Sequence, residues 1–127
     1  MSEHQTQTAF FDWARWQKIS GIESMFAVPN GGARHPAVAA KLKAEGVKSG
    51  VPDVLWPEAR GAFIGLAIEF KHGDSNPSKE QRERIDKLQR AGWLVAVCWS
   101  WEAGARLVQG YAGLLTVQNL TLEKTHG

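Results

Sequence analysis

The chain has 127 residues and a mass of 14.0 kDa, which is the size of one domain of ordinary length. Hydrophobic residues make up 43% of it and charged residues 22%, a mixture typical of a folded protein rather than a disordered one. These values exclude a two-domain enzyme. We expect a single domain over residues 1–127, with a core at about 2–112 and a C-terminal tail at 113–127.

Fifteen Lys and Arg against thirteen Asp and Glu give a net charge of +2, which is too small to identify a polyanionic partner. No uncharged stretch approaches the roughly 20 apolar residues that a membrane span needs, so we expect no membrane partner. The first four residues are polar and acidic, unlike a secretory signal. Cys98 is the only cysteine, so an internal disulfide is excluded, and the sequence predicts a cytoplasmic protein.

The first half of the chain predicts two helices and a short strand. Ser2 and Gln5 have the spacing of a capping box, which favours a helix from Ser2 to about Lys18. Residues 25–28 read as a strand that runs into a Pro-Asn-Gly-Gly turn. A second helix is predicted over 35–45, because a proline occupies its first turn and a glycine follows its end.

The second half predicts three strands and two helices. Strands are expected at 51–56 and 62–71, then a helix from Ser78 to just before Gly92, a strand at 93–99 buried on both faces, and a helix at 102–108. Helices and strands in this order predict an α/β fold, a mixed β-sheet flanked by helices.

Two acids and a lysine fall where two of the predicted strands end. Alternation along 62–71 places Glu69 and Lys71 on the same face as the small residues Gly65 and Ala67. Asp53 lies at the mouth of the preceding strand, so pairing of the two strands would bring it near Glu69. Judged alone, Asp53 could be a turn residue, and Glu69 with Lys71 an exposed pair.

This set of residue types suits hydrolysis of a phosphodiester bond. Two carboxylates about 4 Å apart repel by roughly 4 kcal/mol at an effective dielectric constant of about 20, and a divalent cation relieves that repulsion. Carboxylate oxygens are ligands for Mg²⁺ or Mn²⁺, which polarise a phosphate and lower the pKa of a bound water. A lysine beside them can neutralise charge that gathers on the phosphoryl oxygens.

The first predicted helix carries Glu3 and Gln7 at the head of an apolar face. We expect this face to cover Gly65 and Ala67, which would bring Glu3 and Gln7 to the end of the sheet where Asp53 lies. An acid in the first turn also interacts favourably with the dipole of any helix, so Glu3 has a structural explanation as well.

Five motifs in order resemble the virus-type replication-repair nuclease (VRR-NUC) family, a branch of the PD-(D/E)XK nuclease superfamily. The resemblance covers roughly residues 2–112. The motifs are Glu3-x-x-x-Gln7, Pro29-Asn30-Gly31-Gly32-x-Arg34, Gly50-x-Pro52-Asp53, Glu69-Phe70-Lys71 and Ser78-x-x-Gln81. The resemblance implies a restriction-endonuclease-like core. Compact members of the family from phages and bacteria are homodimers that cut branched DNA such as four-way (Holliday) junctions, so the resemblance implies this activity as well.

The resemblance also implies the residue roles. Asp53 and Glu69 match the metal ligands, the backbone carbonyl of Phe70 a further ligand, and Glu3 the acid that completes the site. Lys71 matches the catalytic lysine and Gln81 the glutamine near the nucleophile or phosphate, although a helix cap with Ser78 also explains Gln81. The expected cofactor is Mg²⁺ or Mn²⁺.

Contacts with DNA are expected from two sets of residues. The turn Asn30-Gly31-Gly32, with Arg34 and Lys48, offers backbone N–H groups and positive charge to a phosphate, and is otherwise merely a tight turn. Gln7 and His72 are the other candidates, and His72 could equally be an ordinary loop residue.

Size favours the homodimer, since a 14.0 kDa fold exposes roughly 6,700 Å² and a specific DNA interface buries about 1,000–2,500 Å² of it. Two copies related by a two-fold axis supply two sites for a symmetric junction.

Two alternatives to a junction-selective nuclease stay open, and a third function is excluded. A non-catalytic nucleic-acid-binding module of the same fold is one alternative, and an exonuclease or nickase without junction selectivity is another. A nucleotide cofactor is excluded, because the segment Gly46-Val47-Lys48-Ser49-Gly50 lacks the Gly-Lys pair of a phosphate-binding loop.

Overall fold

The structure, a computed structural model, describes residues 1–29 and 35–115. Helices and strands follow the expected order, with one addition, the 3₁₀-helix η1 (Ile22–Ser24). The strands are β1 (Phe26–Ala27), β2 (Val54–Trp56), β3 (Gly65–Phe70) and β4 (Trp93–Cys98). The helices are α1 (Glu3–Arg15), α2 (Pro36–Ala44), α3 (Lys79–Ala91) and α4 (Trp101–Ala112).

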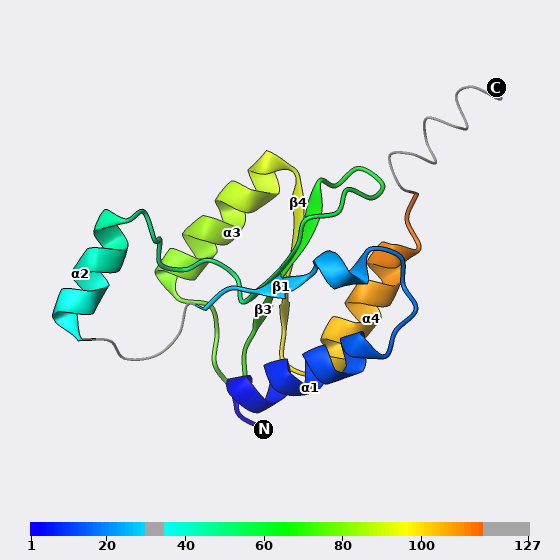
Figure 1. Ribbon diagram of the computed structural model, residues 1–127, viewed down its shortest axis with the longest axis horizontal. Coiled ribbons are helices and arrows are strands. Elements are labelled where there is room, and N and C mark those ends of the chain that lie inside the picture. Colours follow the sequence, from blue (N-terminus) through cyan, green and yellow to red (C-terminus); the bar gives the residue numbers. More distant parts are fainter. Residues whose placement is uncertain (30–34, 116–127) are drawn as a thin grey trace.

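The four strands form one mixed sheet in the order β1-β2-β3-β4, which confirms the predicted fold class. β1 and β2 are antiparallel, as are β2 and β3, and the parallel pair β3 and β4 is joined through α3. α1 and α4 pack together on one face of the sheet and α3 lies on the other, whereas α2 projects from the body (Figure 1). Within the described ranges, no helix is long and apolar enough to span a membrane.

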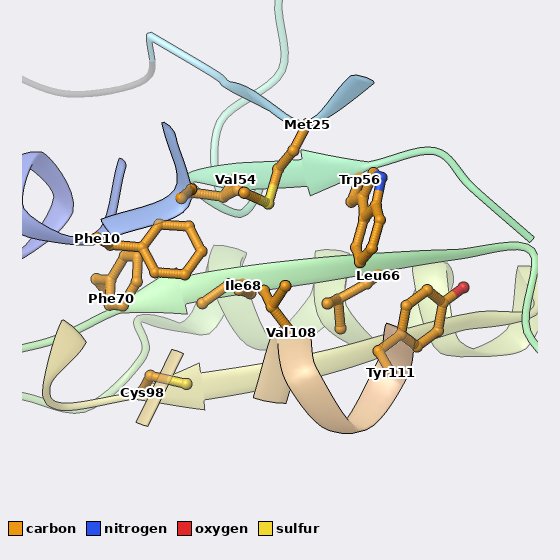
Figure 2. Close-up of a cluster of buried hydrophobic side chains, with 11 residues drawn as sticks. Phe10, Met25, Val54, Trp56, Leu66, Ile68, Phe70, Cys98, Val108 and Tyr111 are labelled. Atoms are coloured by element: carbon orange, nitrogen blue, oxygen red, sulfur yellow. The ribbon is translucent and has the colours of Figure 1, made fainter. Parts of the chain in front are cut away.

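The hydrophobic core lies between the sheet and the pair α1 and α4. Figure 2 shows Phe10 and Phe70 at one end of this core and Trp56 and Tyr111 at the other. The Phe10 and Phe70 rings lie 5.3 Å apart between centroids, and both side chains are fully buried. A Cβ on Gly104 of α4 would lie only 3.0 Å from either ring, so glycine lets α4 approach this pair closely.

The face of β3 that α1 covers is not the expected one. α1 packs on the bulky face through Phe10 and Phe70, because large side chains bury more apolar area than glycine and alanine can. The space beside Gly65 is filled instead by the ring of Trp93, which a Cβ on Gly65 would approach to 2.5 Å. The small residue of β3 therefore accommodates a neighbouring strand's tryptophan rather than a helix.

Three other expectations need correction. β4 was expected to be buried on both faces, but all of its residues except Cys98 are half-buried, because it is the outer strand of the sheet. β2 and β3 are shorter than predicted, so Asp53 and Lys71 each lie just outside a strand. α4 is longer than predicted and begins at a Ser100 cap, whose hydroxyl accepts the Ala103 N–H.

Candidate active site

The register of β2 and β3 brings Asp53 and Glu69 together. Val54 pairs with Ile68, so the next position along each strand sets Asp53 opposite Glu69. The two carboxyl groups are in hydrogen-bonding contact. Asp53 also accepts the backbone N–H of Phe70 at 2.8 Å, which holds this carboxylate against the end of β3.

Glu69 is the buried member of this pair. Its side chain is 1% exposed, and Gln81 donates an Nε2–H to its Oε2 at 2.8 Å. Burial, followed by the hydrogen bond with Asp53 and the charge of Asp53, raises the pKa of Glu69 from 4.5 to about 9, while the charge of Lys71 acts in the opposite direction. Without a cation, Glu69 therefore carries a proton at neutral pH.

Gln81 reaches Glu69 from the first turn of α3. Ser78 caps this helix, since its hydroxyl accepts the Gln81 N–H at 3.2 Å and Gln81 Oε1 accepts the Ser78 N–H at 2.8 Å. The amide of Gln81 thus uses its oxygen for the cap and its nitrogen for Glu69. The predicted cap is confirmed, and the same side chain contacts buried Glu69, whereas a place for Gln81 near the nucleophile or phosphate stays a prediction.

Gly50 positions the segment that leads to Asp53. Its φ of +81° is in the left-handed region, and a Cβ there would lie 2.5 Å from the Glu80 carbonyl oxygen. Only glycine lets the backbone before Asp53 lie directly against the start of α3. Gly50 stands in one of the sequence motifs, but its left-handed φ and its contact with α3 depend on the folded structure and have no signal in the sequence.

Lys71 follows β3 directly and is half-buried. Its backbone N–H donates to the Cys98 carbonyl at 2.9 Å, which continues the pairing of β3 with β4 by one residue. Its positive charge lies near enough to Glu69 to lower the pKa of that carboxyl group. The structure therefore places the predicted lysine beside the predicted acids.

Glu3 reaches the same end of the sheet from the start of α1. Its Oε2 lies 2.7 Å from Nδ1 of His72, and its negative charge contributes to the raised pKa of Glu69. Glu3 and Gln7 line a cavity of about 550 Å³ together with Asp53. Glu3 and Gln7 thus lie at the end of the sheet where Asp53 lies, as expected, although α1 packs on the other face of β3. His72, expected at the DNA, is paired with Glu3.

The oxygen atoms of this site are of the chemical type that binds a divalent cation. Asp53 and Glu69 supply carboxyl oxygens, and a divalent cation would take the place of the proton that Glu69 holds, which suits Mg²⁺ or Mn²⁺. Among residues 1–29 and 35–115, no group of three or more His, Cys, Asp or Glu is placed to hold a metal ion. The structure thus presents a pair of carboxylates, with Glu3 engaged by His72 rather than joined to them.

The expected DNA contacts of the turn are only partly described. Asn30, Gly31, Gly32 and Arg34 lie outside the described residues. Lys48 is exposed and lies beside α3, where it lines a cavity of about 130 Å³ with Glu80, Glu83 and Lys87. The structure does not bring Lys48 into the cavity that Asp53 lines.

Several residues that line the larger cavity were not expected from the sequence. His4, Thr8 and Arg15 of α1 line it, as do Phe11 of α1 and three residues at β1. The i, i+4 series of residues 3, 7, 11 and 15 forms one stripe along a helix and would have identified Phe11 and Arg15, and the adjacent pair of residues 4 and 8 would have added His4 and Thr8.

Comparison with known proteins identifies the family. The family model of the VRR-NUC domain matches residues 2–101. A solved structure described as a VRR_NUC domain protein is 32% identical in sequence, with a TM-score of 0.80 over 91% of this chain and 92% of that chain. No curated protein matches this chain.

The fold, together with these matches, defines a nuclease-type domain of the PD-(D/E)XK type. The chain belongs to the VRR-NUC family.

Proposed function

We propose that this protein is a Mg²⁺- or Mn²⁺-dependent DNA endonuclease that hydrolyses phosphodiester bonds, prefers branched DNA such as four-way junctions, and acts as a homodimer. The single observation that supports the chemistry best is the contact between Asp53 and buried Glu69, with Lys71 beside them. A buried carboxyl group whose pKa is strongly raised, as that of Glu69 is by burial and by the neighbouring Asp53, is typical of functional sites.

Asp53 and Glu69 would hold the cation, with the Phe70 carbonyl and Glu3 as the further ligands assigned by family resemblance. When bound, the cation would polarise the scissile phosphate and make an attacking water more acidic. Glu69 must release its proton before it can act as a ligand, so cation binding should strengthen as pH rises. Glu3 must likewise leave His72 to join the other two acids.

Other groups of the chain orient the two carboxyl groups and neutralise the charge on the phosphate. Gln81 holds one Glu69 oxygen and thereby fixes the direction of the carboxyl group. The Phe70 N–H does the same for Asp53. The Lys71 ammonium balances negative charge that develops on the phosphoryl oxygens during in-line attack by water.

Lys71→Ala tests this proposal directly. Purified wild-type protein and the variant are incubated with linear duplex, nicked duplex and a four-way junction in Mg²⁺, Mn²⁺ or EDTA. We expect cutting of the junction only with metal, a loss of at least about 10²-fold in rate in the variant, and unchanged DNA binding. Lys79→Ala, which removes an exposed lysine from α3, is the matched control and should cut normally.

Three outcomes would contradict parts of the proposal. Binding without cutting in either metal would identify a non-catalytic module. Equal cutting of all substrates would remove the junction preference. A single-chain mass in light scattering, at the concentration used for cutting, would remove the homodimer.

A further inference from the structure

The cavity of about 550 Å³ lies between one face of α1 and the segment 27–29 at β1, and Asp53 lines it. It is therefore continuous with the candidate active site but extends away from the carboxylate pair along α1. Its volume is in the range of small-ligand sites. Its wall includes Gln7, Thr8, Phe11, Ala27, Val28 and Asp53.

The wall of this cavity combines an aromatic ring with hydrogen-bonding groups. Phe11 is half-buried, and its ring packs edge-to-face on Phe10 at a centroid distance of 5.4 Å and an angle of 83°. Because Phe10 is fully buried against Phe70, the Phe11 ring rests on a rigid part of the core. Ala27 and Val28 add small apolar surface at β1.

The polar groups stand one helical turn from that ring. Gln7 precedes Phe11 by four residues, so both lie on one stripe of α1, and its amide offers both donors and an acceptor. The hydroxyl of Thr8 donates to the His4 carbonyl at 2.9 Å, which leaves its oxygen lone pairs available as acceptors. A flat group with apolar faces and polar edges matches this wall.

The charges favour the same kind of occupant. Glu3 and Asp53 make one part of the cavity acidic, so a bare phosphate is disfavoured there, while the neutral wall around Phe11 and Gln7 suits an uncharged ring. Arg15, one turn beyond Phe11, is the cation of this stripe and pairs with Asp12 at the surface.

We propose that this cavity binds one unpaired nucleotide next to the bond that is cut, with its base stacked on Phe11 and its edge bonded by Gln7. The proposal rests on the proposed nuclease function and names the part of the DNA that the site recognises. A base in a duplex cannot enter, because both of its faces are stacked and its edge is paired. The cavity would then favour DNA in which a nucleotide at the branch is unpaired or becomes unpaired on binding.

Phe11→Leu tests the stacking, because leucine retains apolar volume but has no aromatic face. The probes are a duplex with a short single-stranded flap and the same sequence fully paired, both in Ca²⁺ so that the DNA stays intact. A 2-aminopurine is moved through the flap one position at a time. Base stacking on an aromatic side chain changes affinity by roughly 5- to 150-fold.

With the wild-type protein we expect tighter binding of the flap DNA and a change in 2-aminopurine emission at one position. Phe11→Leu should weaken flap binding at least about 5-fold, abolish that change, and leave binding of the paired duplex unaltered. Phe26→Leu is the matched control, because Phe26 is a 48% exposed phenylalanine on β1 outside the cavity. Gln7→Met, which removes only the amide, should also weaken flap binding.

An equal loss of affinity for both DNAs in Phe11→Leu, or retention of the emission change, would overturn the subsite. Thermal unfolding of each variant excludes misfolding as the cause, and Gln7→Met supplies the same test at a position outside the core. Failure of the nuclease proposal has a different signature, in which wild-type protein cuts nothing in Mg²⁺ or Mn²⁺ while the flap signal persists. Normal cutting with no flap signal would reject the subsite alone.

Discussion

The carboxyl group of Glu69 affects stability as well as chemistry. Its pKa is about 9 in the folded protein and near 4.5 when exposed to water, mainly because burial disfavours the charged form. Between these values the folded state holds a proton that the unfolded chain releases. The stabilising contribution of this proton is therefore complete below about pH 4.5 and is lost progressively as pH rises towards 9.

Glu69→Gln should remove this pH dependence. A glutamine resembles the protonated acid, since its oxygen can accept from Gln81 while its amide nitrogen donates to Asp53. In EDTA at pH 8 we expect the variant to be more stable than wild type, on the order of 2 kcal/mol in the free energy of unfolding. At pH 4.5 the two proteins should be nearly equal. Urea denaturation of both proteins at a series of pH values measures this difference in the free energy of unfolding.

The same variant should lose cutting and the stabilisation that Mg²⁺ gives to the folded wild-type protein. If wild type were equally stable at pH 5 and pH 8 in EDTA, the protonated state of Glu69 inferred here would be wrong.

At the scale of elements, the start of α3 serves both folding and the site. Gln81→Ala removes the Glu69 contact and half of the capping box, whereas Ser78→Ala removes only the hydroxyl of the cap. We expect both variants to lose about 0.5–2 kcal/mol of stability. Only Gln81→Ala should slow cutting, by roughly 10-fold or more, because only there is Glu69 left unsupported. Rates measured well below both unfolding temperatures separate these effects, and equal slowing would show that Gln81 acts only as a cap.

The contact between Gly50 and α3 gives a second prediction at this scale. Gly50→Ala would force a Cβ into the Glu80 carbonyl, so the backbone before Asp53 must move. We expect a loss of about 2–4 kcal/mol and a weaker metal site, measured by urea denaturation and by Mg²⁺ titration. Gly46→Ala is the control, because Gly46 also has a positive φ but nothing within 4 Å of the added Cβ. Equal losses in the two variants would refute the packing argument.

Local patterns predicted the elements better than they predicted the packing between them. Capping boxes identified the starts of α1 and α3, and the strand pattern placed Glu69 correctly near the end of β3, with Lys71 one residue beyond that end. The face that α1 covers could not be predicted this way, because it depends on whether the space beside Gly65 is filled by a helix or by Trp93. The pairing of Glu3 with His72 joins residues 69 positions apart and has no local pattern either.

At the scale of the whole molecule, the end of the core opposite the acids is held by polar contacts. The guanidinium of Arg60, 5% exposed, donates to the Ser20 and Ala112 carbonyls at 2.7 Å each and pairs with Glu58 at 2.6 Å. It also lies 5.2 Å from the centre of the Trp56 ring. One side chain thus connects the segment after α1, the turn between β2 and β3, and the end of α4.

Arg60→Leu should therefore destabilise the whole domain without altering the site. It leaves the Glu58 carboxylate and two carbonyls without their partner in a partly buried setting, and we expect a loss of about 2–3 kcal/mol in the free energy of unfolding. Arg60→Lys keeps the charge but not the fork of donors, so its loss of stability should be smaller.

The control variant Arg90→Leu removes an exposed pair with Asp86 and should cost less than about 1 kcal/mol in the free energy of unfolding. Urea denaturation ranks the three variants, and cutting rates measured below their unfolding temperatures should match wild type. A loss for Arg60→Leu no larger than that for Arg90→Leu would contradict the role of Arg60 as a link between these three segments.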